Sequence, residues 1–162
     1  MRRALVAAAI AVAAYLAWGW LFTSAEDQVR AAVAGLAETL SHQAADPLGQ
    51  VAALGQLRQR LADDVVVSTG SGGEVRGRDA VAGLWQRVRA SAERTRVRVL
   101  DVTVVVAADG ATATVEGVGE LTLERSGVPE RDVRDVEATF VLSDGIWRMS
   151  RAALVEAVRP PR

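Results

Sequence analysis

The strongest constraint on this chain is an apolar run, residues 4–22, that carries no charge. As a helix it is about 28 Å long, close to the ~30 Å hydrocarbon core of a bilayer. Arg2 and Arg3 precede the run and Glu26 and Asp27 follow it, which places the N-terminus in the cytoplasm and the rest of the chain outside. We therefore predict a single-pass transmembrane signal-anchor helix over residues 4–22.

Two alternatives to an anchor remain open. A cleavable signal peptide has a shorter apolar stretch and small residues before the cut, whereas Thr23-Ser24-Ala25 is a weak match that follows bulky residues. A buried helix of a cytosolic protein is the other alternative. The aromatic residues of the run collect toward its outer end, as an interfacial belt does; they are Tyr15, Trp18 and Trp20. This distribution favours the anchor.

Composition limits the remaining chain to one domain without strong charge. The 162 residues are 50% hydrophobic and 24% charged, enough for one sizeable core. A net charge of -1 gives no field that would attract nucleic acid. All 19 basic residues are Arg, which we interpret as the codon bias of a GC-rich bacterial genome. We predict a cytoplasmic stub (1–3), the anchor, an outer domain (23–157) on the periplasmic or extracellular side of the inner membrane, and a tail (158–162).

Apolar residues at helical spacing predict three helices in the first half of the domain. The first begins from Thr23, because Thr23 precedes Glu26 and Ser24 precedes Asp27 at the spacing of a capping box. The second starts at Asp46 and Pro47, an N-cap and first helical residue. The third follows "GEVRGRD". Their apolar faces are Val29, Val33, Leu36 and Leu40; Val51, Leu54, Leu57 and Leu61; and Val81, Leu84, Trp85 and Val88.

The second half of the domain predicts strands. Alternating apolar and polar residues run through "ATATVEGVGELTLE" and through residues 135–142. Asp109-Gly110 and Asp144-Gly145 are hairpin turns, and a Gly-Pro loop lies near Val128. A short β-branched strand and a Gly-rich turn also follow the second helix in "ADDVVVSTGSGG". The prediction is an α+β fold in which three helices pack on a curved antiparallel sheet of about four long strands.

Several of these residues resemble one family. They are Asp63-Asp64 before the first strand, Gly77-Arg78-Asp79 at the third helix, and Phe140, Asp144-Gly145 and Trp147-Arg148 in the last hairpin. In this order and spacing, residues 26–157 resemble the nuclear transport factor 2-like superfamily, which includes SnoaL-like polyketide cyclases and ketosteroid isomerases. The resemblance implies a cystatin-like cone with an apolar pocket, and often a dimer formed through the outer face of the sheet. Gly117 and Gly119 would supply the bend.

The resemblance also indicates a site. Trp85, Phe140 and Trp147 are candidates for the lining of a ligand pocket, although aromatic residues at such positions are often core. The position that holds the general base in ketosteroid-isomerase-like members falls on Ser68 or Thr69, and neither hydroxyl is a useful base unaided. We therefore assign no catalytic residue.

Other polar candidates have structural interpretations. His42, the single histidine, would cap the first helix, and Asp63 and Asp64 would form a turn. Arg94, Arg96 and Arg98 would pair across strands with glutamates. The chain has no Cys and no metal-binding spacing, so we predict no metal and no cofactor.

Two functions follow from this sequence. The first is a membrane-anchored binding or scaffold domain that takes a small apolar ligand or a partner protein, alone or as a homodimer, and no nucleic acid. The second is a SnoaL-like enzyme of isomerase, cyclase or dehydratase type that acts on a hydrophobic substrate in the cone. The enzyme requires a buried titratable group inside the pocket.

Overall fold

The computed structural model describes residues 24–43, 47–70 and 72–156. The predicted stub (1–3), transmembrane helix (4–22) and tail (158–162) lie outside this part of the chain. Among the described residues, no helix is both long enough and apolar enough to cross a bilayer.

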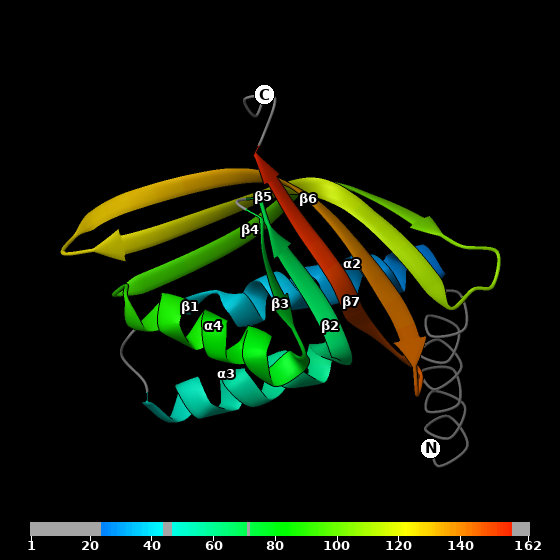
Figure 1. Ribbon diagram of the computed structural model, residues 1–162, viewed down its shortest axis with the longest axis horizontal. Helices are drawn as coiled ribbons and strands as arrows, with labels where there is room; N and C mark the ends of the chain where they lie inside the picture. The colour runs from blue at the N-terminus through cyan, green and yellow to red at the C-terminus, as the bar shows by residue number, and fades with distance from the viewer. Residues whose placement is uncertain (1–23, 44–46, 71, 157–162) are drawn as a thin grey trace, which may run out of the picture.

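Three helices lie on one side of a single sheet (Figure 1). Along the chain the elements are α2 (Ala25–Leu40), β1 (His42–Gln43), α3 (Pro47–Arg60), β2 (Leu61–Thr69), β3 (Gly73–Arg76), α4 (Arg78–Ala90), β4 (Arg94–Val106), β5 (Thr112–Arg125), β6 (Val128–Ser143) and β7 (Ile146–Glu156). The order in the 7-stranded sheet is β1-β4-β5-β6-β7-β2-β3. This confirms the α+β cone. The prediction of a purely antiparallel sheet was wrong, because β2 joins β7 in parallel.

The helices begin where their caps predict. Ser24 is the N-cap of α2, and its hydroxyl accepts a hydrogen bond from the Asp27 N–H at 3.1 Å. Val29, Val33 and Leu36 are buried on one face of this helix, as their spacing predicts. The second helix is one residue shorter than predicted, since Leu61 is the first residue of β2 and not the last apolar residue of α3.

The position of Leu61 explains this error. Leu61 is fully buried and pairs with Met149 of β7, and α3 ends at the preceding residue. At such a junction the same apolar residue completes the helical period and starts the strand. A register shift then separates Leu61 from Val66, so Asp63 and Asp64 lie where the pairing with β7 is interrupted.

The sheet bends where the sequence places glycine. A register shift in β4 separates Leu100 from Thr103, and Asp101 within it has a φ of 52°. On the neighbouring strand, a Cβ added to Gly117 would lie 2.9 Å from the Leu100 carbonyl oxygen. A Cβ added to Gly119 would lie 2.7 Å from a Val136 methyl. These contacts leave no room for a side chain, so both glycines permit the arch that Figure 1 shows over the helices.

Tight turns join the long strands. Asp144 and Gly145 have φ values of 54° and 74° and connect β6 to β7, as predicted. Ser126 and Gly127, with φ values of 51° and 76°, form the connection between β5 and β6. The predicted Gly-Pro loop is therefore a two-residue turn, and Pro129 lies within β6.

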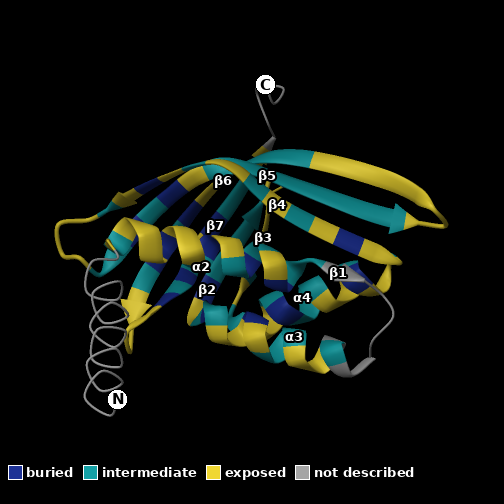
Figure 2. Ribbon diagram, turned by 180° about the vertical axis from the view of Figure 1, so that it is seen from behind, coloured by how far each residue is buried: buried dark blue, intermediate teal, exposed yellow. Residues whose placement is uncertain are grey.

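The core fills the space between the helices and one end of the sheet. Its residues are Val29, Val33, Leu36, Leu57, Leu61, Val65, Ala82, Val104, Ala113, Val115, Ala138, Phe140, Trp147, Met149 and Ala152. Figure 2 shows this burial along α2 and the strands above it, while the ends of β5 and β6 nearest their shared turn are intermediate or exposed. These strand ends contribute no residue to the core cluster, whereas α4 contributes Ala82.

Candidate functional site

The three predicted pocket residues lie in or against one hydrophobic core. Phe140 on β6 is 2% exposed and Trp147 on β7 is 5% exposed, and both belong to the core cluster. Trp85 on α4 is half-buried and packs against that cluster. Of the three, only Trp147 also lines one of the cavities described here. Phe140 therefore belongs to the core, and Trp147 lies where the core meets a cavity.

That cavity, of about 550 Å³, lies between α2 and the β6–β7 turn. Its lining residues are Gln28, Ala31, Ala32, Arg60, Gly145, Ile146 and Trp147. The Trp147 indole N–H donates to the Gln28 side-chain oxygen at 3.3 Å and closes the floor. The Arg60 guanidinium lies over Gly35, where a Cβ would approach it to 2.5 Å. Exposed Ile146 makes the rim apolar, so this groove suits a partly apolar partner.

A second feature is a set of three buried donor atoms without hydrogen-bond partners. They are Nε1 of Trp85, Nη2 of Arg89 and Oγ1 of Thr95. Arg89 is 8% exposed and Thr95 is 2% exposed. Burial lowers the pKa of the Arg89 guanidinium, because the charged form loses its water. Among the described residues, no carboxylate forms an ion pair with Arg89.

Arg89 and Thr95 were not among the site residues predicted from the sequence. Arg89 continues the stripe of Ala82 and Trp85 at helical spacing, so it is a charged residue on the face of α4 that meets the core. Thr95 alternates with exposed Arg94 and Arg96, which places it on the inner face of β4. A charge on a core-facing stripe is the signal that could have revealed this site.

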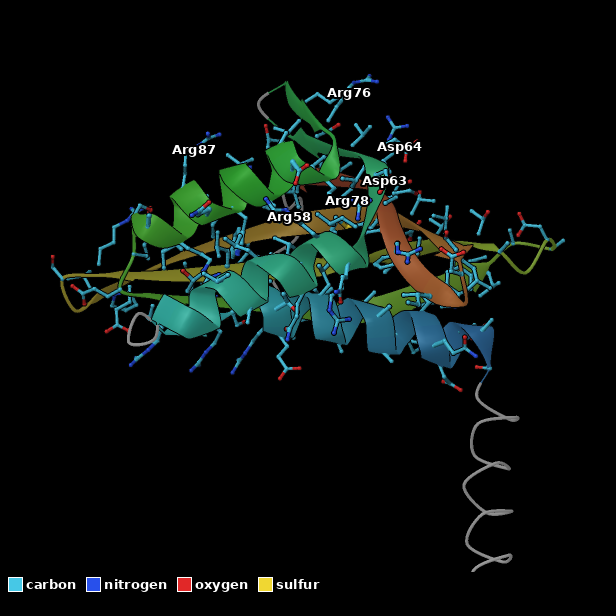
Figure 3. The ribbon with its side chains drawn as sticks, turned by 90° about the horizontal axis from the view of Figure 1, so that it is seen from below. Arg58, Asp63, Asp64, Arg76, Arg78 and Arg87 are labelled. Atoms are coloured by element: carbon cyan, nitrogen blue, oxygen red, sulfur yellow. The ribbon has the colours of Figure 1, made fainter. Side chains whose placement is uncertain are left out.

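Charged residues around Asp63 form ion pairs at the surface. The Arg58 guanidinium lies 2.8 Å from an Asp79 carboxylate oxygen, and Arg78 pairs with Asp63. The labelled side chains of Figure 3 show Asp63 and Arg78 close together, while Arg87 projects away from α4 into solvent. The Asp63 side chain is 83% exposed. The Asp63 and Asp79 carboxylates face water. The predicted turn at Asp63 and Asp64 was wrong, because both residues lie within β2, where its pairing with β7 is interrupted.

The remaining polar candidates also have local roles. Ser41 is the C-cap of α2, and the backbone of His42 in β1 pairs with Thr95 in β4. The Arg94 guanidinium lies 2.9 Å from a Glu124 oxygen, as predicted for cross-strand pairs. Among residues 24–43, 47–70 and 72–156, no group of three or more His, Cys, Asp or Glu side chains could hold a metal ion.

Comparison with known proteins agrees with this fold. A Mycobacterium tuberculosis protein of unknown function superposes with a TM-score of 0.66 at 17% identity, over 80% of this chain and 70% of that one. A nuclear transport factor 2-like protein with a cystatin-like fold from Novosphingobium aromaticivorans has a TM-score of 0.64 at 19% identity, over 92% and 90%.

A third structure carries an enzymatic name. This protein of the same superfamily from Streptomyces avermitilis, provisionally named a dehydratase, has a TM-score of 0.65 at 15% identity, over 82% and 96%. No curated protein matches the chain. The family of the SnoaL-like domain matches residues 23–153, and this chain therefore belongs to the SnoaL-like domain family.

Proposed function

We propose that this protein is a single-pass, membrane-anchored binding domain without catalytic activity. Residues 4–22 would hold it in the inner membrane of a bacterium, with the N-terminus in the cytoplasm and the SnoaL-like domain outside. The support is the length of the uncharged run, its flanking charges and the start of α2 at Ala25. The domain then begins at the membrane surface and can receive an apolar ligand from it.

The buried polar side chains support the proposal that the domain binds a ligand and does not catalyse a reaction. Within the described residues, the buried polar side chains are Thr39, Arg89 and Thr95. The Thr39 hydroxyl donates to the Gly35 carbonyl at 2.7 Å, so it serves the helix. Arg89 stays protonated at neutral pH and cannot accept a proton from a substrate. An interior that combines donors with apolar walls supports binding over acid–base catalysis.

The outer face of the sheet is the proposed surface for a second copy or a partner protein. Glu116 and Glu137 lie opposite each other on β5 and β6 and are exposed. With Asp101 and Asp135 they line a cavity of about 490 Å³. This surface is acidic, which favours a partner that brings basic groups.

The second candidate is a SnoaL-like enzyme that acts on a hydrophobic substrate in the cone. The provisionally named dehydratase among the similar structures is the observation that favours it. Such an enzyme needs a base near its substrate. The aligned position offers Ser68 and Thr69, both half-buried hydroxyls, and the Thr69 hydroxyl donates to the Gly73 carbonyl at 3.2 Å.

Mass spectrometry of protein from fractionated native membranes tests the proposal. We expect the N-terminus to be intact at Met1 or Arg2 in the membrane fraction, together with a small apolar molecule whose mass and chromatographic retention do not change on incubation with the purified chain. A mature chain that starts near Glu26 would contradict the anchor. Conversion of the bound molecule to a dehydrated or isomeric product would contradict the absence of catalysis and support the enzyme.

A further inference from the structure

Three buried donors surround the connection between α4 and β4. Arg89 lies in the last turn of α4, and Thr95 is the second residue of β4. The Ala92 N–H donates to the Arg89 carbonyl at 3.1 Å, and the Glu93 N–H donates to the Glu124 carbonyl at 2.8 Å. The chain thus reverses tightly here. Figure 1 shows the end of α4 meeting the start of β4 beneath the arch of the sheet.

Two of the three side chains share one face of α4, and the third lies on the inner face of β4. Trp85 and Arg89 are four residues apart on α4 and therefore lie on one face of the helix. Thr95 pairs with Leu123 across β4 and β5, on the side of the sheet that faces the helices. Each side chain has a buried nitrogen or oxygen without a partner. Such atoms are costly, and a buried cation without a counter-charge is costlier still.

Neighbouring acids do not neutralise Arg89, because they have other partners. The Arg125 guanidinium lies 2.8 Å from a Glu130 oxygen, and the Arg134 guanidinium lies 3.0 Å from an Asp132 oxygen. Glu93 accepts a hydrogen bond from the Ser126 N–H at 3.1 Å. In the part of the chain that the structure describes, no carboxylate forms an ion pair with Arg89. A ligand group that accepts hydrogen bonds and carries negative charge would therefore complement Arg89 and the Trp85 N–H, and the Thr95 hydroxyl can donate to the same group.

Charge and geometry select the kind of anion. One guanidinium balances one negative charge, whereas a buried dianion would keep an uncompensated charge. A carboxylate accepts about four hydrogen bonds in its plane, which suits the planar fork of Arg together with an indole N–H and a hydroxyl. A carboxylate monoanion is thus the group that fits these donors.

Apolar surface continues from the donors along the inner face of the sheet. Val97 and Leu121 are cross-strand neighbours one step beyond Thr95 and Leu123. Val97, Leu121 and Leu123 are half-buried and lie outside the core cluster and the residues packed against it. From Thr95 to Val99 the strand rises about 13 Å, a length that an extended chain of about ten carbons covers.

We propose that the cone binds a carboxylate-bearing aliphatic ligand, with Arg89, Trp85 and Thr95 holding the carboxylate and the inner face of β4 and β5 holding the chain. This inference rests on the proposed binding function and names its ligand class. Arg89 would neutralise the carboxylate, and the indole and hydroxyl would fix its orientation.

Binding of decanoate to the full chain in lipid nanodiscs tests the inference. Decanoate labelled with 13C at its carboxyl group is titrated and followed by NMR, with empty nanodiscs to subtract partition into lipid. Decanamide has the same chain without the charge, and decyl phosphate carries a headgroup that can become a dianion. We expect decanoate to bind about tenfold or more tightly than decanamide and more tightly than decyl phosphate.

Substitutions on α4 and β4 separate recognition from folding. Arg89→Gln should weaken decanoate binding about tenfold to a hundredfold and leave decanamide binding unchanged, because a charge-assisted contact is lost. Thr95→Val, which keeps the shape of the side chain, and Trp85→Phe, which keeps an aromatic ring without the N–H, should each weaken it about threefold. Arg87→Gln is the matched control, since Arg87 lies on the same helix and projects into solvent (Figure 3), and it should bind like the original chain.

The comparison of ligands needs no substitution and does not depend on how a variant folds. Equal affinity for decanoate and decanamide overturns the inference and leaves the proposed binding function in place. Tighter binding of decyl phosphate, unchanged affinity of the Arg89→Gln variant, or no saturable binding of any of the three ligands also overturns it. Chemical conversion of bound decanoate would instead contradict the proposed lack of catalysis while the carboxylate preference still held.

Discussion

Asp109 organises the turn between β4 and β5 through its side chain. Its carboxylate accepts hydrogen bonds from the Ala111 N–H at 2.8 Å and the Thr112 N–H at 3.0 Å, and from the Thr112 hydroxyl at 3.1 Å. These bonds lower the pKa of Asp109 below its ordinary value of 3.8 because they stabilise the charged form. Gly110 supplies the positive φ of 66° that the same turn requires.

The lowered pKa of Asp109 predicts a pH-dependent stability. A carboxylate whose folded pKa is depressed stabilises the fold above its unfolded pKa, and this stabilisation is lost as the pH falls through the folded pKa. We expect Asp109→Ala to lower the melting temperature at neutral pH, and the difference from the original chain to vanish well below pH 3.8. Melting curves measured from neutral to acid pH test this. Asp64→Ala at an exposed site is the control, and a difference that persists in acid would contradict the argument.

The bend is the property of β5 that most depends on its sequence. Gly117→Ala would place a Cβ 2.9 Å from the Leu100 carbonyl oxygen, which is backbone and cannot rotate away. We expect a loss of about 1–3 kcal/mol in the free energy of unfolding. Gly83→Ala is the matched control: on α4 its Cβ would meet nothing within 4 Å, so it should stabilise the domain by about 0.5–1 kcal/mol. Chemical denaturation of both variants measures the difference, and a neutral Gly117→Ala would show that the arch does not need glycine there.

At the scale of elements, the sequence predicted what local periodicity encodes. The N-cap at Ser24, the apolar stripe of α2 and the Asp144-Gly145 turn depend on neighbouring residues and were confirmed. The parallel pairing of β2 with β7 joins segments distant in the sequence, and the alternation of apolar residues carries no information about the partner strand. Strands β1 and β3 were missed because they are short.

The site was less predictable than the fold for a related reason. Aromatic residues drew attention to Trp85, Phe140 and Trp147, since large apolar side chains mark cores and pockets equally well. In the sequence, Arg89 resembles any other charged residue of a helix, and only the structure shows that it is buried. Whether a buried donor has a hydrogen-bond partner depends on all the elements packed around it, and a single sequence does not give their positions.

For the molecule as a whole, the outer face of the sheet predicts how its association depends on salt. Glu116 and Glu137 face each other across strands, and a homodimer through this region would bring the acidic groups of two copies together. Such a dimer should tighten as added salt screens the repulsion, and Glu137→Gln should tighten it at low salt by up to about tenfold. Sedimentation of the full chain in detergent at low and high salt measures this. Dissociation at high salt would indicate that basic groups of the other copy meet these carboxylates.

The place of β7 in the sheet determines when the domain can fold during its synthesis. Strands β2 and β3 reach the rest of the sheet only through β7, which lies between β6 and β2 and is the last strand of the chain. Strands β2 and β3 therefore wait for β7, and the contacts that close the sheet have a large sequence separation, a property of slowly folding proteins. If the N-terminal run engages the membrane first, the growing polypeptide crosses it unfolded and closes its sheet only after the ribosome has delivered β7.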